Sequence, residues 1–157
     1  MVIHVYTDGA CKGNPGKGGW GVYWSDNGVD HEMCGGDADT TNNRMELTAV
    51  IKALEMVQGP KKVWTDSQYV YKGITEWMSE WKKKDWKNSH KRPVLNQDLW
   101  KRVDELLLQS TTPTEFAWVK AHNGEKGNEK ADALANQGLP TQRHIGIHGT
   151  GARFREG

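Results

Sequence analysis

Residues 41–66 read TNNRMELTAVIKALEMVQGPKKVWTD, and they decide the fold class because a helix pattern is followed there by a strand pattern. The apolar residues at the spacing of one helix face are Leu47, Val50, Ile51 and Leu54. Thr41 or Asn42 is placed to cap a helix that runs to about residue 57, and Gly59-Pro60 stops it. The next five residues, 61–65, predict a short strand that ends at Asp66.

Three further strands are predicted upstream of this helix. Residues 2–7 form an apolar, β-branched and aromatic run that ends at Asp8-Gly9, and similar strands are expected near 19–25 and 31–36. Residues 12–19 are dense in glycine and are interpreted as the turn between the first two strands. Because the links are short, the three strands should form an antiparallel meander.

Downstream of Asp66, helices and one more strand alternate. Ser67 can cap a helix through Trp77, and a loop rich in lysine and tryptophan follows from about 82 to 93. A helix over 96–109, a strand over 114–119 and a helix over 126–137 that Gly138 terminates complete the pattern. This order predicts an α/β fold with a five-stranded mixed sheet, in which three antiparallel strands are continued by parallel strands and helices flank the sheet.

The bulk properties fit one globular domain. The chain has 157 residues, of which 36% are hydrophobic and 26% charged, with a formal net charge of only +1. Its two cysteines, Cys11 and Cys34, are too few for a secreted disulfide framework and are interpreted as reduced thiols. No signal peptide and no membrane span are recognisable, so we expect a soluble, cytoplasmic and monomeric protein. Residues 140–157, rich in glycine and arginine, are interpreted as a flexible tail without an assigned role.

Four acidic residues are candidates for a site. Asp8 and Asp66 each follow a predicted strand in a near-repeat, Thr-Asp-Gly and Thr-Asp-Ser, although an ordinary turn or capping aspartate explains either one alone. Glu46 lies on or beside the apolar stripe of its helix, where a charge needs a partner; a helix-dipole role is the competing explanation. Asp132 lies among apolar residues of the last helix, and a solvated helix face explains it equally well.

Several converging carboxylates would repel one another unless a cation is present. Magnesium prefers oxygen ligands and works beside phosphates, and two such ions about 4 Å apart can assist displacement at a phosphodiester. The sequence offers no CxxC and no HExxH motif, so zinc is not favoured.

The segment 82–92 carries six Lys or Arg residues among eleven, opposed only by Asp85: Lys82, Lys83, Lys84, Lys87, Lys91 and Arg92. A cationic run is usually a solvated face, but Trp77, Trp81 and Trp86 are interleaved here. Cations that neutralise phosphates beside rings that pack on sugars or bases are typical of nucleic-acid binding, which we favour.

Five separated motifs resemble type 1 ribonuclease H, in order over about residues 1–139: Tyr6–Gly16 (YTDGACKGNPG), Thr41–Leu47 (TNNRMEL), Thr65–Val70 (TDSQYV), Trp118–Gly124 (WVKAHNG) and Asn128–Ala135 (NEKADALA). The resemblance implies a ribonuclease H-like catalytic domain that hydrolyses the RNA strand of RNA/DNA hybrids and leaves 3′-hydroxyl and 5′-phosphate ends. It implies that Mg²⁺, with Mn²⁺ as a substitute and two ions beside bound substrate, is held by Asp8, Glu46, Asp66 and Asp132.

The resemblance also implies roles for residues that are ambiguous by themselves. His122 would assist proton transfer or product release from a mobile loop, whereas a lone histidine beside Gly124 reads as a surface residue. Asn14, Asn42 and Gln68 would contact the minor groove, where 2′-hydroxyls distinguish RNA from DNA. Thr41 would hold a phosphate of the DNA strand, and Trp77 would lie beside that strand. The lysine-rich loop would be the basic protrusion of bacterial members, with Lys82, Lys83, Lys84 and Lys87 on the hybrid backbone. The other tryptophans are assigned to the core.

Two departures from the family pattern are visible: Asn123 replaces a small residue after the histidine, and the segment after Pro140 has no family role. Two competing hypotheses remain besides the hybrid-specific nuclease. A catalytically silent hybrid-binding module would not need four converging acids beside a polyanion. A DNA-cutting relative with the same fold would not need the residues assigned to the minor groove.

Overall fold

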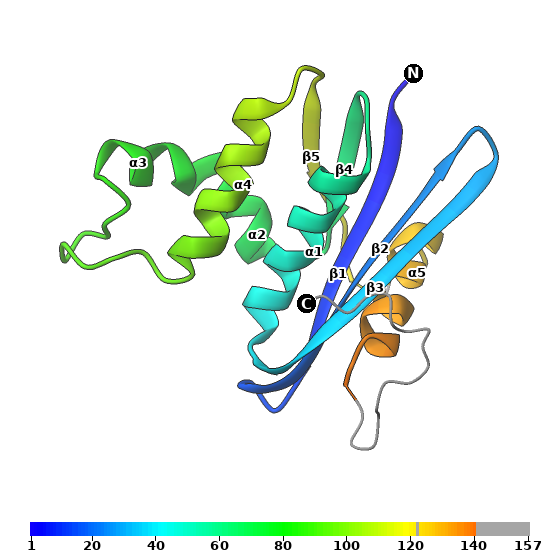
Figure 1. The fold of residues 1–157 in the computed structure, drawn as a ribbon, viewed down its shortest axis with the longest axis horizontal. Coiled ribbons are helices and arrows are strands. Elements are labelled where there is room, and N and C mark those ends of the chain that lie inside the picture. The colour runs from blue at the N-terminus through cyan, green and yellow to red at the C-terminus, as the bar shows by residue number, and fades with distance from the viewer. Residues whose placement is uncertain (122, 141–157) are drawn as a thin grey trace.

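The computed structural model describes residues 1–121 and 123–140, which contain a five-stranded sheet in the order β3-β2-β1-β4-β5 (Figure 1). The antiparallel meander consists of β1 (Ile3–Lys12), β2 (Gly16–Asp26) and β3 (Val29–Thr40). The strand β4 (Lys61–Thr65) pairs in parallel with β1, and β5 (Thr114–Trp118) pairs in parallel with β4. The mixed sheet expected from the sequence is confirmed.

The helices are α1 (Asn42–Met56), α2 (Gln68–Lys72), the π-helical turn η1 (Gly73–Trp77), α3 (Met78–Lys83), α4 (Gln97–Gln109) and α5 (Lys126–Gln137). Thr41 caps α1, because its side chain accepts a hydrogen bond from the backbone N–H of Arg44. Ser67 caps α2 in the same way through Val70. None of the helices in the described part of the chain has the length and apolar character needed to cross a bilayer.

The strands of the meander extend further than the sequence pattern indicated. We expected the first strand to end at Asp8, but β1 continues to Lys12, and β2 already begins at Gly16. The predicted turn over 12–19 is therefore wrong except for a short connection around Asn14-Pro15, a cis peptide bond. The strand β3 likewise covers Val29–Thr40 rather than only 31–36.

The glycines of β2 explain this error. A Cβ on Gly19 would lie 2.1 Å from the carbonyl oxygen of Ala135, and one on Gly21 would lie 2.5 Å from that of Ala131. These glycines therefore lie in a strand against which α5 packs backbone to backbone, and no turn requires them. Glycine marks turns and close approaches alike, which is why the pattern was ambiguous.

The predicted helix 67–77 is interrupted and then prolonged. It consists of α2, the π-helical turn η1 and α3, so Lys82 and Lys83 end a helix rather than begin a loop. Gly73 begins the π-helical turn, and its Cβ would lie 2.0 Å from the ring of Trp100. The irregular turn therefore forms where α4 crosses closely, and π-turns of this kind are frequent at functional sites.

Helices cover both faces of the sheet (Figure 1). Residues alternate along β2, so that Trp20 and Val22 face α1 while Gly19 and Gly21 face α5. One core cluster joins β1, β2 and α1, and the other joins α1, β4 and α4 around the buried Trp100. The layered arrangement brings the middle of β1, the end of β4, the first turns of α1 and the middle of α5 close to one another.

Candidate active site

The register of the sheet places Asp8 and Asp66 side by side. The parallel ladder between β1 and β4 ends at the pair Thr7–Thr65, so each aspartate is the next residue of its chain. Asp66 leaves the sheet there, as expected, whereas Asp8 remains in β1 and pairs with Gly21 of β2. The expectation that both acids follow a strand end is thus confirmed for Asp66 and wrong for Asp8, because β2 keeps β1 extended.

Glu46 reaches these two aspartates because α1 lies directly on β1. A Cβ on Gly9 would be 2.4 Å from the backbone nitrogen of Glu46, and only glycine permits that approach. The side chain of Glu46 is 4% exposed, which confirms that it faces the sheet instead of solvent. A helix-dipole role at an exposed helix start is therefore excluded.

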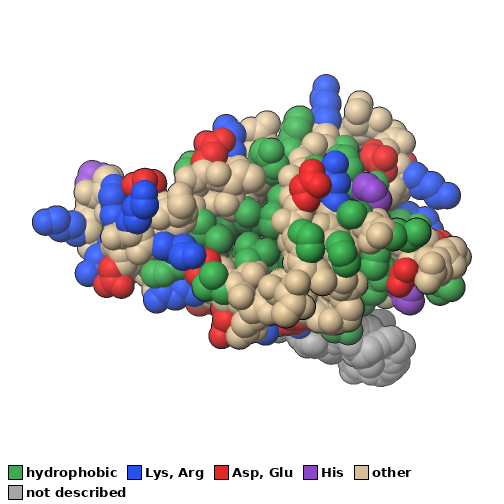
Figure 2. All heavy atoms as spheres, turned by 90° about the horizontal axis from the view of Figure 1, so that it is seen from above, with side chains coloured by type: hydrophobic (Ala, Val, Ile, Leu, Met, Phe, Trp, Pro, Cys, Tyr) green, Lys and Arg blue, Asp and Glu red, His purple; other side chains and the backbone are tan. Residues whose placement is uncertain are grey.

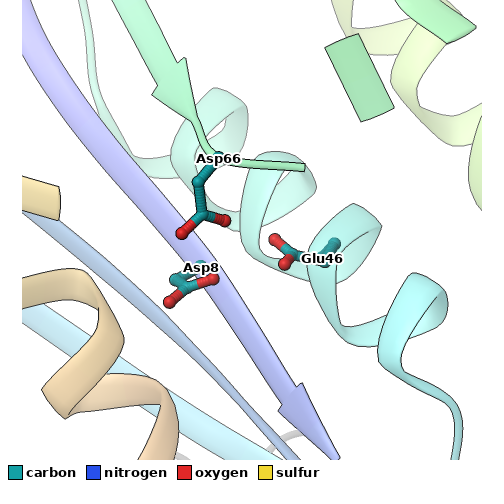
Figure 3. A group of neighbouring side chains, drawn as sticks. All are labelled: Asp8, Glu46 and Asp66. Carbon is teal, nitrogen blue, oxygen red and sulfur yellow. The ribbon is translucent and has the colours of Figure 1, made fainter. Parts of the chain in front are cut away.

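The three acids converge from β1, from α1 and from the connection after β4, with their carboxylates directed toward one another (Figure 3). One oxygen from each of Asp8, Glu46 and Asp66 lies within 4.8 Å of the other two. The donor set consists of carboxylate oxygens alone, which suits a hard cation such as Mg²⁺. The buried Oε1 of Glu46 has no hydrogen-bond partner among the described residues, so these acids fit a divalent ion well.

The electrostatic interactions among these carboxylates oppose their full ionisation. Burial, the neighbouring charge of Asp66 and a hydrogen bond with Asp132 together raise the pKa of Asp8 to about 8. Burial and the charges of Asp8 and Asp66 raise the pKa of Glu46 well above its ordinary value. Several nearby carboxylates of this kind share protons until a cation replaces them.

Asp132 joins the cluster from the opposite face of the sheet. It lies on α5, half-buried, and its side chain is close enough to hydrogen-bond with Asp8. The helix approaches because small residues meet there: Ala131 and Ala135 of α5 lie on Gly21 and Gly19 of β2. The solvated-face interpretation of Asp132 is therefore excluded by its contact with Asp8.

The polar residues expected to contact nucleic acid lie at the edge of this site. The side-chain Oδ1 of Asn14 accepts a hydrogen bond of 2.8 Å from the backbone N–H of Asn42, which joins the β1–β2 connection to the start of α1. Both asparagine side chains are exposed, Thr41 is half-buried, and Gln68 is exposed at the start of α2, two residues after Asp66. His122 lies outside the described residues.

The basic segment projects from the body of the protein beyond α3, where blue side chains gather at the left end of the molecule in Figure 2. Its lysines are exposed but not equivalent. Lys82 forms an ion pair of 2.9 Å with Asp104 of α4, whereas Lys83 and Lys87 have only long contacts, to Glu80 at 3.7 Å and Asp85 at 3.9 Å. Lys82 is therefore directed toward the body of the protein.

The tryptophans in and just before the basic segment pack against one another and against α4, and so attach the segment to the body of the protein. Trp81 packs edge-on to the buried Trp100, and Trp77 and Trp86 each contact Trp81. A groove beside them is lined by Trp77, Trp81, Lys84 and Lys87 together with Glu76 and Glu80. Trp20, Trp24 and Trp100 are buried as expected, but Trp118 is 39% exposed, and its Nε1 donates to the carbonyl oxygen of Asp66.

Two contacts of the site were not foreseen from the sequence. Asn128, 2% exposed, places its Nδ2 3.5 Å from Oδ2 of Asp66. Arg44 binds Asp98 of α4 through both of its terminal nitrogens and so joins the start of α1 to the base of the basic segment. The sequence could have indicated Asn128, because it precedes Asp132 by four residues and therefore lies on the same face of the helix.

Comparison with known proteins gives a consistent match. The family model for RNase H matches residues 1–140. A ribonuclease H of Polaromonas naphthalenivorans is 55% identical over 139 residues, which cover 87% of this chain and 86% of that protein.

Solved structures agree. The crystal structure of LC9-RNase H1, a type 1 RNase H with the type 2 active-site motif, aligns with a TM-score of 0.75 at 30% identity and covers 88% of this chain and 72% of that one. The crystal structure of LC11-RNase H1 in complex with RNA/DNA hybrid aligns with a TM-score of 0.67 at 26% identity. The alignment covers 87% of this chain and 96% of that one.

Proposed function

The chain belongs to the type 1 RNase H family of endonucleolytic hydrolases, and we propose that it cuts the RNA strand of RNA/DNA hybrids by a two-metal-ion mechanism that leaves 3′-hydroxyl and 5′-phosphate ends. The observation that carries the mechanism is the cluster of buried carboxylates. Asp8 and Glu46 are almost fully buried, and one oxygen from each of them and from Asp66 lie within 4.8 Å of one another. Anions so close and so desolvated need cations to remain ionised.

Asp8, Glu46, Asp66 and Asp132 are the residues that would hold the ions, with Mg²⁺ as the cofactor and Mn²⁺ as a substitute. Bound divalent ions would supply an activated water and stabilise the charge on the attacking and leaving oxygens. Asp8 lies at the centre of the set, since its carboxylate is within 4.8 Å of those of Glu46 and Asp66 and hydrogen-bonds with Asp132. Glu46 completes the set from α1, and its unpartnered Oε1 is the oxygen left for an ion or its water.

Choice of substrate is assigned to the residues around the start of α1 and α2. Asn14, Asn42 and Gln68 present amides that can donate to and accept from 2′-hydroxyls in a shallow minor groove. The bond between Asn14 and the backbone of Asn42 holds these two residues together. Thr41 directly precedes Asn42 as the N-cap of α1, where backbone N–H groups and the helix dipole favour a phosphate of the DNA strand.

The basic segment supplies the remaining contacts. Exposed lysines that neutralise phosphates add affinity without reading sequence. Lys83, Lys84 and Lys87 are the residues assigned to the hybrid backbone, and Trp77 is assigned to the sugar face of the DNA strand. Lys82 contributes less than these three, because Asp104 already neutralises it.

A DNA-cutting enzyme with the same fold is the second candidate. The observation in its favour is a neighbour of low identity: a foamy viral protease-reverse transcriptase in complex with dsDNA aligns over 88% of this chain at 25% identity. The same viral protein is also known in complex with RNA/DNA hybrid. The exposed amides of Asn14 and Asn42 favour the hybrid.

One assay separates these functions. Labelled RNA/DNA hybrid, duplex RNA and duplex DNA are incubated with the protein and Mg²⁺, and the products are resolved by length and end group. We expect cutting of the RNA strand of the hybrid alone, with 5′-phosphate on the downstream fragment. Equal cutting of all three duplexes would refute the proposal. Asp8→Asn should abolish cutting and leave hybrid binding nearly intact, with Asp39→Asn on the exposed end of β3 as the matched control.

A further inference from the structure

Asn128 is a buried polar residue at the start of α5 to which the chemistry above assigns nothing. Its Nδ2 approaches Oδ2 of Asp66 at 3.5 Å, the long end of the hydrogen-bonding range. Its Oδ1 is buried and has no partner in residues 1–121 and 123–140. A buried amide with one end unsatisfied is costly, so each such group in a native protein needs an explanation, such as a bound water, an ion or a role in the site.

The backbone beneath Asn128 is held in place. A Cβ on Gly127 would lie 2.4 Å from the ring of Tyr6, so the first turn of α5 rests directly on β1. Glu125 caps the helix by accepting from the N–H of Gly127 at 2.9 Å, and it also hydrogen-bonds with the side chain of Tyr6. The amide of Asn128 is therefore presented to Asp66 from a rigid support.

Asn128 and Asp132 lie four residues apart and so share one face of α5. Asp132 contacts Asp8, and Asn128 contacts Asp66. The helix thus touches the carboxylate cluster at two points, one turn apart. The rotation of α5 is set by its close packing on Gly19 and Gly21 of β2, so Asn128 and Asp132 are presented to the cluster together.

We propose that Asn128 is a positioning residue of the carboxylate cluster: its N–H holds the carboxylate of Asp66, while Asp132, one turn further along α5, contacts Asp8. Its carbonyl oxygen is left to accept a hydrogen bond from water in the site. This inference rests on the proposed function and deepens it. Partners that orient ligating carboxylates typically change metal affinity or activity by about 10- to 100-fold when removed.

Two variants separate polarity from packing. Asn128→Ala removes the amide and its volume, whereas Asn128→Leu keeps the branched shape, with a somewhat larger volume, and has no polar atoms. Asn136→Ala is the matched control, since the exposed side chain of this asparagine of α5 hydrogen-bonds, among the described residues, with the backbone carbonyl of Asp132 and not with a carboxylate. For each protein, Mg²⁺ binding to the free enzyme is measured by titration calorimetry, kcat and KM are measured on hybrid, and melting is followed by circular dichroism.

We expect both Asn128 variants to bind Mg²⁺ about tenfold or more weakly and to lose kcat to a similar degree, with KM for the hybrid nearly unchanged. Asn136→Ala should behave like the wild type. A folded Asn128→Leu protein with wild-type Mg²⁺ affinity would overturn the proposal and leave only a packing role. If alanine and leucine prevent folding, Asn128→Ser is measured in the same way: its shorter side chain moves the donor away from Oδ2 of Asp66, so Mg²⁺ binding should again weaken.

The titration does not use the substrate, so the two proposals fail separately. A wild-type protein that binds Mg²⁺ and leaves hybrids uncut would refute the proposed function, while the affinities of the Asn128 variants would still decide the present inference.

Discussion

Gly9 and Glu46 touch through their backbones: a Cβ added to Gly9 would lie 2.4 Å from the nitrogen of Glu46 and 2.6 Å from the carbonyl carbon of Met45. This contact sets the depth at which α1 lies on β1. It therefore also sets the separation of the carboxylates of Asp8 and Glu46, which belong to these two elements.

Gly9→Ala should consequently disturb both stability and the site. The added methyl must push α1 from β1, and overpacking of this kind costs about 1–3 kcal/mol or more. We expect a lower midpoint in urea unfolding and weaker Mg²⁺ binding by calorimetry. Gly28→Asn is the control. A Cβ added to this glycine would have no atom within 4 Å, and asparagine tolerates its φ of +78°. Equal midpoints for Gly9→Ala and the wild type would show that α1 does not lie this close.

Asp8→Asn should stabilise the metal-free protein, and the gain should grow with pH. The folded-state pKa of Asp8 is about 8, far above its ordinary value of 3.8, so folding favours the protonated form. The stability of the wild type is then greatest at acidic pH and falls as pH rises from about 4 to about 8, by an amount on the order of a few kcal/mol. Asparagine stays neutral and avoids this loss. Melting midpoints with EDTA between pH 4.5 and pH 8.5 provide the measurement.

The expected difference between Asp8→Asn and the wild type is small at the acid end and largest near pH 8. A constant difference across the range would contradict repulsion in the cluster. Saturating Mg²⁺ should reverse the order, because a ligand that binds only the folded state stabilises it and the wild type binds more tightly.

Replacing Lys83, Lys84 and Lys87 with alanine should weaken hybrid binding without impairing the chemical step. Each lost phosphate contact makes the slope of log affinity against log salt concentration less negative by about 0.9. The slope of the triple variant should therefore be less negative by about 2 to 3 than that of the wild type. KM measured from 50 to 200 mM KCl tests this. Lys82→Ala serves as the internal contrast and should change KM less than Lys84→Ala, since Lys82 is paired with Asp104. A fall in kcat at unchanged KM would argue against a binding role.

Gly73→Ala tests the π-helical turn. Its methyl would meet the ring of Trp100 at 2.0 Å, so either η1 or α4 must shift, at a cost of about 1–3 kcal/mol. Because α3 and the basic segment follow η1, KM for the hybrid should rise more than kcat falls. Thr75→Ala lies in the same turn, loses only a bond to the carbonyl of Tyr71, and should cost less than about 1 kcal/mol. Identical melting of Gly73→Ala and the wild type would contradict the close crossing.

The spacing of apolar residues along the chain was sufficient to predict the helices and strands that bury one face. The helix capped by Thr41 and the parallel strand that ends before Asp66 follow from local patterns, and both are confirmed. Glu46 could be singled out because a charge on an apolar stripe needs an explanation. These features depend on neighbours along the chain, which a sequence records directly.

The remaining features depend on contacts between distant segments. The glycines of β2 looked like turn residues until α5 was placed on them, and the extension of β1 past Asp8 depends on pairing with β2. The contact of Asp132 with Asp8 likewise requires knowledge of how α5 crosses the sheet. The tryptophans around Trp81 were ambiguous for the same reason, since their packing on Trp100 joins two helices.

The adjacency of Asp8 and Asp66 has a consequence for how the chain tolerates insertions. Both residues follow the last rung of the β1–β4 ladder, so hydrogen-bond register rather than loop length fixes their spacing. The hairpin tip at Asn27-Gly28 and the connection around Gly59 lie outside that ladder. Extra residues at either position, such as an epitope tag, would leave Asp8 and Asp66 next to each other. A shift of the β1–β4 register by one residue would separate them without any change of side chain.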